Sequence, residues 1–471
     1  MHNIEQIFIN GEFVTPHGTE RFDLYNPATA RVIGQVRLAD EVDGERAIAA
    51  AKAAFPAWSQ TSKAERIAAL KRMHAAVVAR HDELLEAVIE EYGAPASRSA
   101  WMASYPAEVI AQAIAVLEAF EFTSSAGAAT VQMVPLGVAG LITPWNSDAG
   151  FICGKLAVAL AAGCTAVIKP SEMSALQTRV ITEALADAAL PPGVFNIVTG
   201  RGDRVGETLS RHPDVAKISF TGSTATGKAI LRNAAESFKR VTLELGGKSP
   251  TILLEDVDLT NAIPLVVQAG FMNSGQACVA GTRILVPQSR KAEIETALAD
   301  AVAAVKSGDP RDNATEIGPM VSEKQWQRVQ SYIRKGIDEG ARLLAGGEGR
   351  PEDTQDGWFV RPTLFADVNN QMAIARDEIF GPVLCVIPYR DEAEAVAIAN
   401  DTDYGLSAMV LGGDVARAHR VAQQIVSGRV LVNTLAHEPK APFGGFKHSG
   451  VGREMGEWGI RAFMEPRSVV G

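Results

Sequence analysis

The chain has 471 residues, of which 47% are hydrophobic and 21% are charged. This balance is ordinary for a globular protein and argues against disorder, and the length exceeds one ordinary core, so two large domains are expected. The net charge of −10, from 45 basic and 55 acidic side chains, argues against a nucleic-acid-binding surface.

The N-terminus has no basic region followed by an apolar run, so no signal peptide is expected. The longest apolar stretch, around residues 156–162, is far too short to span a membrane. The cysteines are widely spaced, which suggests neither a disulfide framework nor a metal site: Cys153, Cys164, Cys278 and Cys385. We therefore expect a cytoplasmic protein with no metal, no nucleic-acid partner and no membrane partner.

A hairpin-like segment opens the chain, and helical periodicity then dominates from about Glu45 to Phe120, with Pro56 as a break. From Gly137 onward, short β-branched runs alternate with helical stretches. Strands are expected at residues 138–142, 165–168, 195–198, 217–220 and 240–243, and helices at 154–162 and 175–189. Nearly continuous apolar strands joined by helices indicate a buried, doubly wound parallel sheet.

A second strand–helix alternation runs from residues 251–254 to residues 430–432. Its helices are expected at residues 259–269, 290–305 and 392–400. The two α/β domains would meet near Gly246 and Gly247, where glycine permits a sharp change of direction. Residues 346–356 are interpreted as a solvated surface loop.

Cys278 is the first candidate for chemistry, because it follows the turn-forming run Asn273-Ser274-Gly275. Upstream, Glu244 stands beside paired glycines. A thiolate nucleophile needs an exposed position and a polarising group, and covalent catalysis then needs a base that activates water. This cysteine and this glutamate can supply both, although a free cysteine is more often a small buried hydrophobe.

Two glycine-rich segments are candidates for phosphate binding. Residues 200–206 are one residue too long for G-x-G-x-x-G and are interpreted as a loop and helix start. Residues 222–228 match G-x-x-x-x-G-K, but Ala229 follows where a P-loop needs a hydroxyl for magnesium. A phosphate-binding helix N-terminus is still possible there, but an NTPase is not.

Together these segments resemble the aldehyde dehydrogenase superfamily, whose members are NAD(P)-dependent and non-phosphorylating. The matching blocks occur in the family's order and cover nearly the whole chain: residues 8–11, 143–146, 168–172, 220–223, 243–248, 271–278, 378–382 and 442–447. The resemblance implies two doubly wound parallel-sheet domains, a Rossmann-like NAD-binding domain and a catalytic domain, with a small β oligomerisation arm.

The implied NAD-binding domain comprises residues 1–118 and 136–246, and the catalytic domain comprises residues 247–448. The implied arm comprises residues 119–135 and 449–471. Within it, residues 131–134 and 467–470 look like strands that pair between subunits. We therefore expect a homodimer or a homotetramer.

For catalysis, the resemblance implies that Cys278 is the nucleophile and Glu244 the base that activates water. The side-chain amide of Asn146 and the backbone N–H of Cys278 would stabilise the oxyanion. Lys155 and Glu454 match groups along the family's proton path. Their alternative interpretations, a solvated lysine and a helix-surface glutamate, remain open.

NAD is the implied cofactor. Its pyrophosphate would lie at the helix opened by Gly222 and Ser223, its adenosine ribose against Lys169 and Glu172, and its nicotinamide against Glu378, Phe380 and Trp145. A carboxylate at Glu172 repels a 2′-phosphate, so NAD is favoured over NADP, unless Glu172 only caps the next helix. The full cofactor set is Ile142, Thr143, Pro144, Trp145, Lys169, Ser171, Glu172, Gly202, Phe220, Thr221, Gly222, Ser223, Leu245, Gly246, Glu378 and Phe380.

The substrate tunnel is where this chain departs from its relatives. Many members continue from the Trp-Asn pair with Phe-Pro-Leu, whereas this chain has Ser147-Asp148-Ala149. A wider and more polar tunnel is expected, lined by Ser147, Asp148, Met272, Ala277, Val279 and Phe443. The loop 434–442, which contains His437, is a candidate for its mouth. Asp148 alternatively caps the helix that begins near Gly150.

The expected reaction is the NAD-dependent oxidation of a small-molecule aldehyde to the carboxylic acid, through a thiohemiacetal and a thioester on Cys278. A CoA-acylating semialdehyde dehydrogenase of the same fold is one alternative. A binding or structural protein that keeps the fold without turnover is another. A thiol protease would need a histidine near the cysteine, and only His437 and His448 lie near these motifs.

Overall fold

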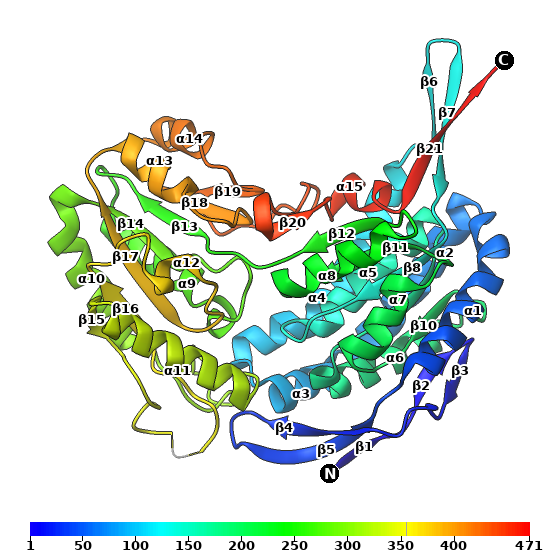
Figure 1. Ribbon diagram of the computed structural model, residues 1–471, viewed down its shortest axis with the longest axis horizontal. Coiled ribbons are helices and arrows are strands. Elements are labelled where there is room, and N and C mark those ends of the chain that lie inside the picture. The colour runs from blue at the N-terminus through cyan, green and yellow to red at the C-terminus, as the bar shows by residue number, and fades with distance from the viewer. Residues whose placement is uncertain (355) are drawn as a thin grey trace.

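Two large sheets covered by helices form the two halves of the molecule, and a narrow β arm projects from one of them (Figure 1). The computed structural model describes residues 1–354 and 356–471. Gln355, in the loop predicted at residues 346–356, lies outside the described residues. The two-sheet α/β architecture predicted from the sequence is confirmed.

The first sheet has eight strands in the order β20-β12-β11-β8-β9-β10-β2-β3. Its strands are β2 (Ile7–Ile9), β3 (Glu12–Val14), β8 (Val138–Ile142), β9 (Thr165–Lys169), β10 (Phe195–Ile197), β11 (Val215–Thr221), β12 (Arg240–Glu244) and β20 (Gly450–Val451). The five central strands, β8 to β12, are parallel and match the predicted ones. The strand order reverses beside β8, so a ligand crevice is expected beyond its carboxyl end.

The helices packed around this sheet are α1 (Glu41–Ser59), α2 (Lys63–Ala79), α3 (His81–Ala87), α4 (Ala96–Ala119), α5 (Asp148–Ala162), α6 (Ala175–Asp187), α7 (Glu207–Arg211), α8 (Thr224–Ala235) and α15 (Gly456–Arg461). Pro56 does not break its helix, because it lies in the last turns of α1. The predicted hairpin is β2–β3, whose turn residues Asn10 and Gly11 both have positive φ, 54° and 84°. A smaller sheet, β1-β5-β4, pairs β1 (His2–Ile4), β5 (Arg31–Arg37) and β4 (Arg21–Asn26).

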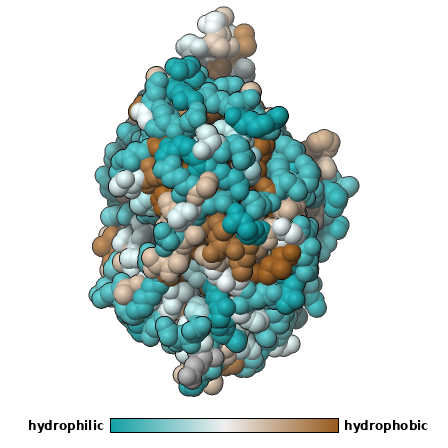
Figure 2. Space-filling view, turned by 90° about the vertical axis from the view of Figure 1, so that its left-hand side faces the viewer, coloured by the Kyte–Doolittle hydropathy of each residue, from teal (hydrophilic) through white to brown (hydrophobic). Residues whose placement is uncertain are grey.

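The second large sheet has seven strands in the order β15-β16-β17-β14-β13-β18-β19. They are β13 (Pro250–Leu253), β14 (Arg283–Pro287), β15 (Arg342–Ala345), β16 (Thr363–Ala366), β17 (Val383–Tyr389), β18 (Ser407–Leu411) and β19 (Arg429–Val432). Its helices are α9 (Leu259–Gly270), α10 (Lys291–Ala304), α11 (Glu323–Asp338), α12 (Ala373–Arg376), α13 (Glu392–Asn400) and α14 (Val415–Ala422). Figure 2 shows this end of the molecule as mainly hydrophilic, with one hydrophobic patch near its centre.

The arm is an antiparallel sheet of β21 (Met464–Val470), β7 (Ala129–Pro135) and β6 (Thr123–Ala126), in that order. Residues 131–134 and 467–470, expected as strands that could pair between subunits, lie in β7 and β21, and these strands pair with each other within the chain from Met464↔Pro135 to Val470↔Ala129. The C-terminal strand β21 therefore forms backbone hydrogen bonds along one edge of β7, and β21 is itself an edge strand of the arm. Residues 450–461 of the predicted arm lie with the eight-stranded sheet, as β20 and α15.

Helix α4 is long and apolar enough to cross a membrane by length and composition, with a mean hydropathy of 1.2 over its most apolar window. It is longer than the apolar stretch at residues 156–162 on which the sequence-based expectation rested. In the structure α4 packs against α2 and α5 and places Met102, Ile110 and Leu117 in the core. Core packing accounts for the apolar residues on its buried face.

The link between the two large sheets, residues 245–249, contains the predicted glycines. Neither Gly246 nor Gly247 has a positive φ, so a sharp change of direction is not the reason for them. A Cβ on Gly246 would lie 2.5 Å from Oε2 of Glu378, and one on Gly247 would lie 2.3 Å from the carbonyl oxygen of Cys278. Glycine is required here because neighbouring segments pass too close for any side chain.

Candidate active site

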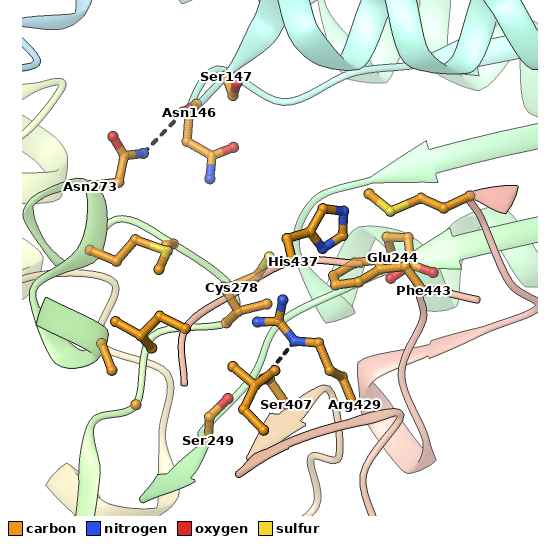
Figure 3. Close-up of a pocket in the computed structure, with 18 of the residues that line it drawn as sticks. Asn146, Ser147, Glu244, Ser249, Asn273, Cys278, Ser407, Arg429, His437 and Phe443 are labelled. Atoms are coloured by element: carbon orange, nitrogen blue, oxygen red, sulfur yellow. Dashed lines mark hydrogen bonds between the residues drawn. The ribbon is translucent and has the colours of Figure 1, made fainter. Parts of the chain in front are cut away.

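Two cavities meet between the carboxyl ends of the first sheet and the amino ends of the second. The larger has a volume of about 500 Å³ and the smaller about 310 Å³. Four residues line both cavities: Asn146, Thr221, Glu244 and Cys278. The three residues predicted to carry the chemistry therefore lie together at the boundary (Figure 3).

Cys278 is presented by an unusual turn. Asn273, Ser274 and Gly275 are consecutive left-handed residues, with φ of 54°, 59° and 74°. Asparagine and glycine tolerate this region, which explains the turn-forming run. Cys278 is half-buried, whereas the other three cysteines are buried.

The Cys278 thiol lies in an environment that disfavours its ionisation. Burial, with Glu378 and Glu244 nearby, raises the pKa of the thiol to about 12, against the opposing effect of Arg429. The resting group is therefore the neutral thiol, and it needs a base to become a nucleophile.

The Asn146 side chain is held by a hydrogen-bond network around the cysteine turn. Its Nδ2 donates to the carbonyl of Gln276 at 3.0 Å, and Asn273 Nδ2 donates to the Asn146 carbonyl at 3.0 Å. Gln276 is itself anchored, since its Oε1 accepts from the backbone N–H of Val321 at 3.0 Å. An amide nitrogen has two hydrogens, so Asn146 retains one for a ligand.

Glu244 ends β12 and is only 3% exposed, yet neither of its carboxyl oxygens has a hydrogen-bond partner in the described part of the chain. Burial, with Glu454 nearby, raises the pKa of Glu244 well above its ordinary value, against the opposing effect of Lys155. A Cβ on Gly444 would lie 2.7 Å from Oε1 of Glu244, so glycine leaves room for this carboxyl. A buried, unpaired carboxyl facing a cavity is suited to general-base chemistry.

Lys155 and Glu454 are also brought together. Lys155 Nζ lies 2.5 Å from Oε1 of Glu454, and Ser219 Oγ donates to the same oxygen at 2.9 Å. Lys155 is 3% exposed, so its interpretation as a solvated lysine is wrong. Ser219 was not identified from the sequence, since a serine within an apolar strand carries no distinguishing signal.

The smaller cavity is lined by most of the residues predicted to hold the nicotinamide and pyrophosphate: Pro144, Trp145, Thr221, Gly222, Ser223, Leu245, Gly246, Glu378 and Phe380. The rings of Trp145 and Phe380 meet edge to face at 5.4 Å. Glu378 accepts from the backbone N–H of Gly247 at 3.0 Å, and burial raises its pKa to about 7. Gln325 and Arg328 also line this cavity and were not predicted.

The remaining predicted cofactor residues lie outside that cavity. Ile142 and Phe220 are core residues, and Thr143 Oγ1 donates to Asp148 at 2.9 Å. Gly202 opens a turn, and Ser171 caps the turn that begins at Glu172.

Glu172 pairs with charged side chains and does not cap its helix. It lies 3.6 Å from Lys169 Nζ and 3.2 Å from Nη1 of Arg201. Arg201, which was not predicted, also pairs with Glu20 at 2.8 Å.

Five of the six predicted tunnel residues line the larger cavity: Ser147, Met272, Ala277, Val279 and Phe443. The prediction for Asp148 is wrong. Asp148 is fully buried and accepts hydrogen bonds from Thr143 at 2.9 Å and Thr178 at 2.7 Å. Residues 147 and 148 begin α5, so their side chains point in different directions and only Ser147 reaches the cavity.

His437 lines the same cavity as Cys278, but no hydrogen bond joins the two within the described ranges. Burial, with Arg429 nearby, lowers the pKa of His437. No group of three or more His, Cys, Asp or Glu side chains suited to a metal ion occurs among the residues that the structure describes.

Comparisons with known proteins agree with this geometry. A family model described as the aldehyde dehydrogenase family matches residues 13–469, and the chain belongs to that family. A 3-succinoylsemialdehyde-pyridine dehydrogenase of a Pseudomonas species is 44% identical over 100% of this chain and 99% of its own length.

Two solved structures are also close in fold. A mutant of aldehyde dehydrogenase C of Pseudomonas syringae, in complex with NAD⁺ and octanal, has a TM-score of 0.97 and 44% identity, covering 99% of this chain and 96% of its own. An aldehyde dehydrogenase of Mycobacterium tuberculosis in complex with NAD⁺ has a TM-score of 0.96 and 41% identity, covering 99% of this chain and 98% of its own. The present chain is an enzyme of the same class, an aldehyde dehydrogenase.

The contact between Gly247 and the Cys278 carbonyl gives a first prediction. Gly247→Ala places a methyl 2.3 Å from that oxygen, so the cysteine turn must move. A displacement of about 1 Å costs on the order of 100-fold in turnover, and we expect a loss of kcat of that size in an NADH-absorbance assay. Gly459→Ala is the control, since its Cβ meets only ordinary contacts at 3.6 Å. Wild-type kcat in Gly247→Ala would contradict the assigned role of this contact.

Proposed function

We propose that this enzyme oxidises an aldehyde to the carboxylic acid with NAD as hydride acceptor, through covalent intermediates on Cys278. The observation that carries the proposal is the shared boundary of the two cavities, where Cys278, Asn146 and Glu244 all lie. A substrate in the larger cavity and a cofactor in the smaller one would meet at the thiol.

The residues of the smaller cavity fit NAD. Ser223 caps the 12-residue helix α8, whose N-terminal N–H groups and dipole favour a pyrophosphate. Thr221 Oγ1 is buried without a hydrogen-bond partner in the described part of the chain, and the aromatic rings of Trp145 and Phe380 line the cavity where a flat ring would lie. The NAD⁺ complexes of two relatives support this assignment.

Glu172 favours NAD over NADP, because a carboxylate accepts hydrogen bonds from ribose hydroxyls and repels a 2′-phosphate.

In the first half-reaction Cys278 loses its proton to a base, and Sγ attacks the aldehyde carbon. The resulting oxyanion accepts hydrogen bonds from Asn146 Nδ2 and from the backbone N–H of Cys278, and one such donor is worth roughly 2.7–4 kcal/mol. The residues of the smaller cavity would hold NAD, which when bound would supply the hydride acceptor for the thiohemiacetal carbon. A thioester then remains on Cys278.

In the second half-reaction Glu244 takes a proton from water, and the hydroxide attacks the thioester carbon. The C–S bond breaks, the carboxylic acid leaves, and the Cys278 thiolate regains a proton. Glu244 is suited to this step because its unpaired carboxyl is buried and has a raised pKa. In the Lys155–Ser219–Glu454 cluster, Glu454 lines both the larger cavity and a third cavity of about 80 Å³, and we propose that the cluster relays the proton.

Two alternatives compete with this proposal. In a CoA-acylating dehydrogenase, CoA takes the acyl group in place of water, and no water-activating base is needed. The buried, unpaired Glu244 favours hydrolysis. A binding protein without turnover would have no use for an oxyanion donor held as Asn146 is held.

We propose three parts for the chain: an NAD-binding part from residues 1–118 and 136–246, a catalytic part from residues 247–448, and an oligomerisation arm. The four free thiols support a reducing, cytoplasmic setting. The arm projects from the body with β21 as an open edge strand, which supports a homodimer or homotetramer.

The roles of the nucleophile and the base give a second prediction. Cys278→Ala should abolish NADH formation from any aldehyde. Glu244→Gln should slow deacylation, so that a burst of NADH is followed by weak turnover in stopped-flow measurements. Because the pKa of Glu244 is raised and its ionised form is the base, wild-type deacylation should rise with pH through that pKa, and Glu244→Gln should flatten this rise.

An unchanged rate in Cys278→Ala would refute the whole mechanism. Loss of turnover in Glu244→Gln without any acyl-enzyme would instead mean that Glu244 also deprotonates the thiol.

The position after Asn146 gives a third prediction. Ser147 lines the larger cavity at the position where the family resemblance implies a phenylalanine in many members, and its Oγ has no hydrogen-bond partner among the described residues. Ser147→Phe should lower kcat/KM for ring-bearing aldehydes by roughly 10- to 200-fold through steric exclusion, with propanal nearly unchanged. Ser147→Ala, which removes only the hydroxyl, is the control. An equal fall for all chain lengths would show that position 147 acts through Asn146 and the oxyanion.

The open edge of β21 gives a fourth prediction. Sedimentation velocity at micromolar concentration should show a dimer or tetramer, and Val469→Pro on the exposed half of β21 should shift it toward smaller species, since proline removes a backbone donor. A wild-type species of 50.0 kDa would refute the proposed assembly.

A further inference from the structure

Arg429, the first residue of β19, presents a cation to the larger cavity. Its Nε donates to Ser407 Oγ at 3.2 Å, and within the described ranges it forms no ion pair with a carboxylate. In Figure 3 its guanidinium points toward Cys278. Burial lowers the pKa of this guanidinium, against the opposing effect of Cys278.

Arg429 belongs to a row of polar side chains that crosses three adjacent strands. In the sheet register Arg429 lies opposite Ser407, the first residue of β18. One strand further, Thr251 of β13 lies opposite Met409, so Ser249 falls two residues earlier, next to Ser407. All three of Ser249, Ser407 and Arg429 line the cavity. We call them the polar row.

The polar row has unused hydrogen-bonding capacity. Ser249 is 3% exposed, and its Oγ has no partner among the described residues. Among the described residues Arg429 donates a hydrogen bond only through Nε, and its guanidinium lies over the Phe443 ring at 5.8 Å, so Nη1 and Nη2 can still donate to a ligand. A guanidinium offers those groups in the geometry that matches the two oxygens of a carboxylate.

The carboxyl groups that line the cavity do not neutralise this cation. Glu454 pairs with Lys155, Glu244 lies against Gly444, and Glu108 is exposed at the surface. A second guanidinium, that of Arg98 from α4, lines the same cavity stacked on Trp101 at 3.9 Å, and its buried Nε has no partner in the described part of the chain. The cavity therefore contains two guanidinium groups, those of Arg429 and Arg98, which the carboxyl groups lining the described cavity do not neutralise.

Resting on the function proposed above, we propose that the substrate is an aldehyde that carries a carboxylate, an ω-oxo acid. Arg429 binds the carboxylate through its Nη groups, with Ser249 donating a further hydrogen bond, while the aldehyde carbon lies at Cys278. The covalent steps are unchanged, and Arg429 determines specificity. The product is a dicarboxylate.

The test compares charged and neutral aldehydes of equal length: 4-oxobutanoate with butanal, and 5-oxopentanoate with pentanal. The wild-type enzyme should have a kcat/KM at least tenfold higher for the charged member of one pair. Arg429→Met should lower that value by roughly 30-fold or more, because the anion loses its half-buried cationic partner, and should leave the neutral aldehyde within about threefold. Arg429→Lys should recover part of the loss.

Arg98→Met is the matched control, since it removes the same charge from the same cavity and leaves the polar row intact. An equal effect of Arg98→Met and Arg429→Met would overturn the assignment of the carboxylate to Arg429. An equal fall of kcat/KM for the charged and neutral aldehydes in Arg429→Met would also overturn it, if alkylation of Cys278 by iodoacetamide shifted to higher pH in that variant. Those two results together would assign Arg429 to the Cys278 thiolate. Absence of any preference in the wild type would also overturn it.

A binding measurement separates this proposal from the proposed function. Succinate, a dicarboxylate product, should slow alkylation of Cys278 by iodoacetamide in the wild type but not in Arg429→Met, and butanamide should protect neither. This readout needs neither NAD nor turnover. Protection by succinate without NADH from any aldehyde would leave the carboxylate site standing and refute the dehydrogenase mechanism. Turnover of an aldehyde without protection by succinate would refute the carboxylate site and leave the dehydrogenase mechanism standing.

Discussion

The close approach of Gly247 to the carbonyl of Cys278 is the constraint on which the active site depends. It fixes the link between the sheets against the cysteine turn, so that Glu244, at the end of β12, stands at a fixed place relative to the thiol. Glu378 adds a second restraint by accepting a hydrogen bond from the Gly247 N–H while facing the smaller cavity. One short segment thus positions nucleophile, base and cofactor site together.

The same packing sets the electrostatics of the site. Burial raises the pKa of both Cys278 and Glu244, and a charged Glu244 further opposes ionisation of the Cys278 thiol. Both groups are therefore held in their neutral forms in the free enzyme. Lys155, near Glu244, is the cation that favours the charged form of this carboxyl.

The sequence predicted the two-sheet fold and the central residues because these depend on local patterns: apolar strands, a turn-forming run before Cys278, glycines beside Glu244. The sequence-based prediction failed where the direction of a side chain or the register of a strand decides which residues meet. Asp148 is adjacent to Ser147 in sequence, but the helix turns it into the core. Arg429 was missed because its position beside Ser407 is set by strand register, which pairs residues far apart in the chain.

Ser147, at the start of α5, and the polar row, at the β13, β18 and β19 strands, line different parts of the same cavity. Both make this cavity more polar than a purely apolar tunnel. A small residue on one side gives a ligand room to turn, and a fixed cation on the other gives it a preferred orientation. Width alone would admit many aldehydes without discriminating among them. A half-buried cation alone is partly desolvated in the free enzyme without a carboxylate partner to offset that cost. The two features therefore make physical sense together, as a cavity whose selectivity comes from charge at one end of the ligand more than from the shape of its walls.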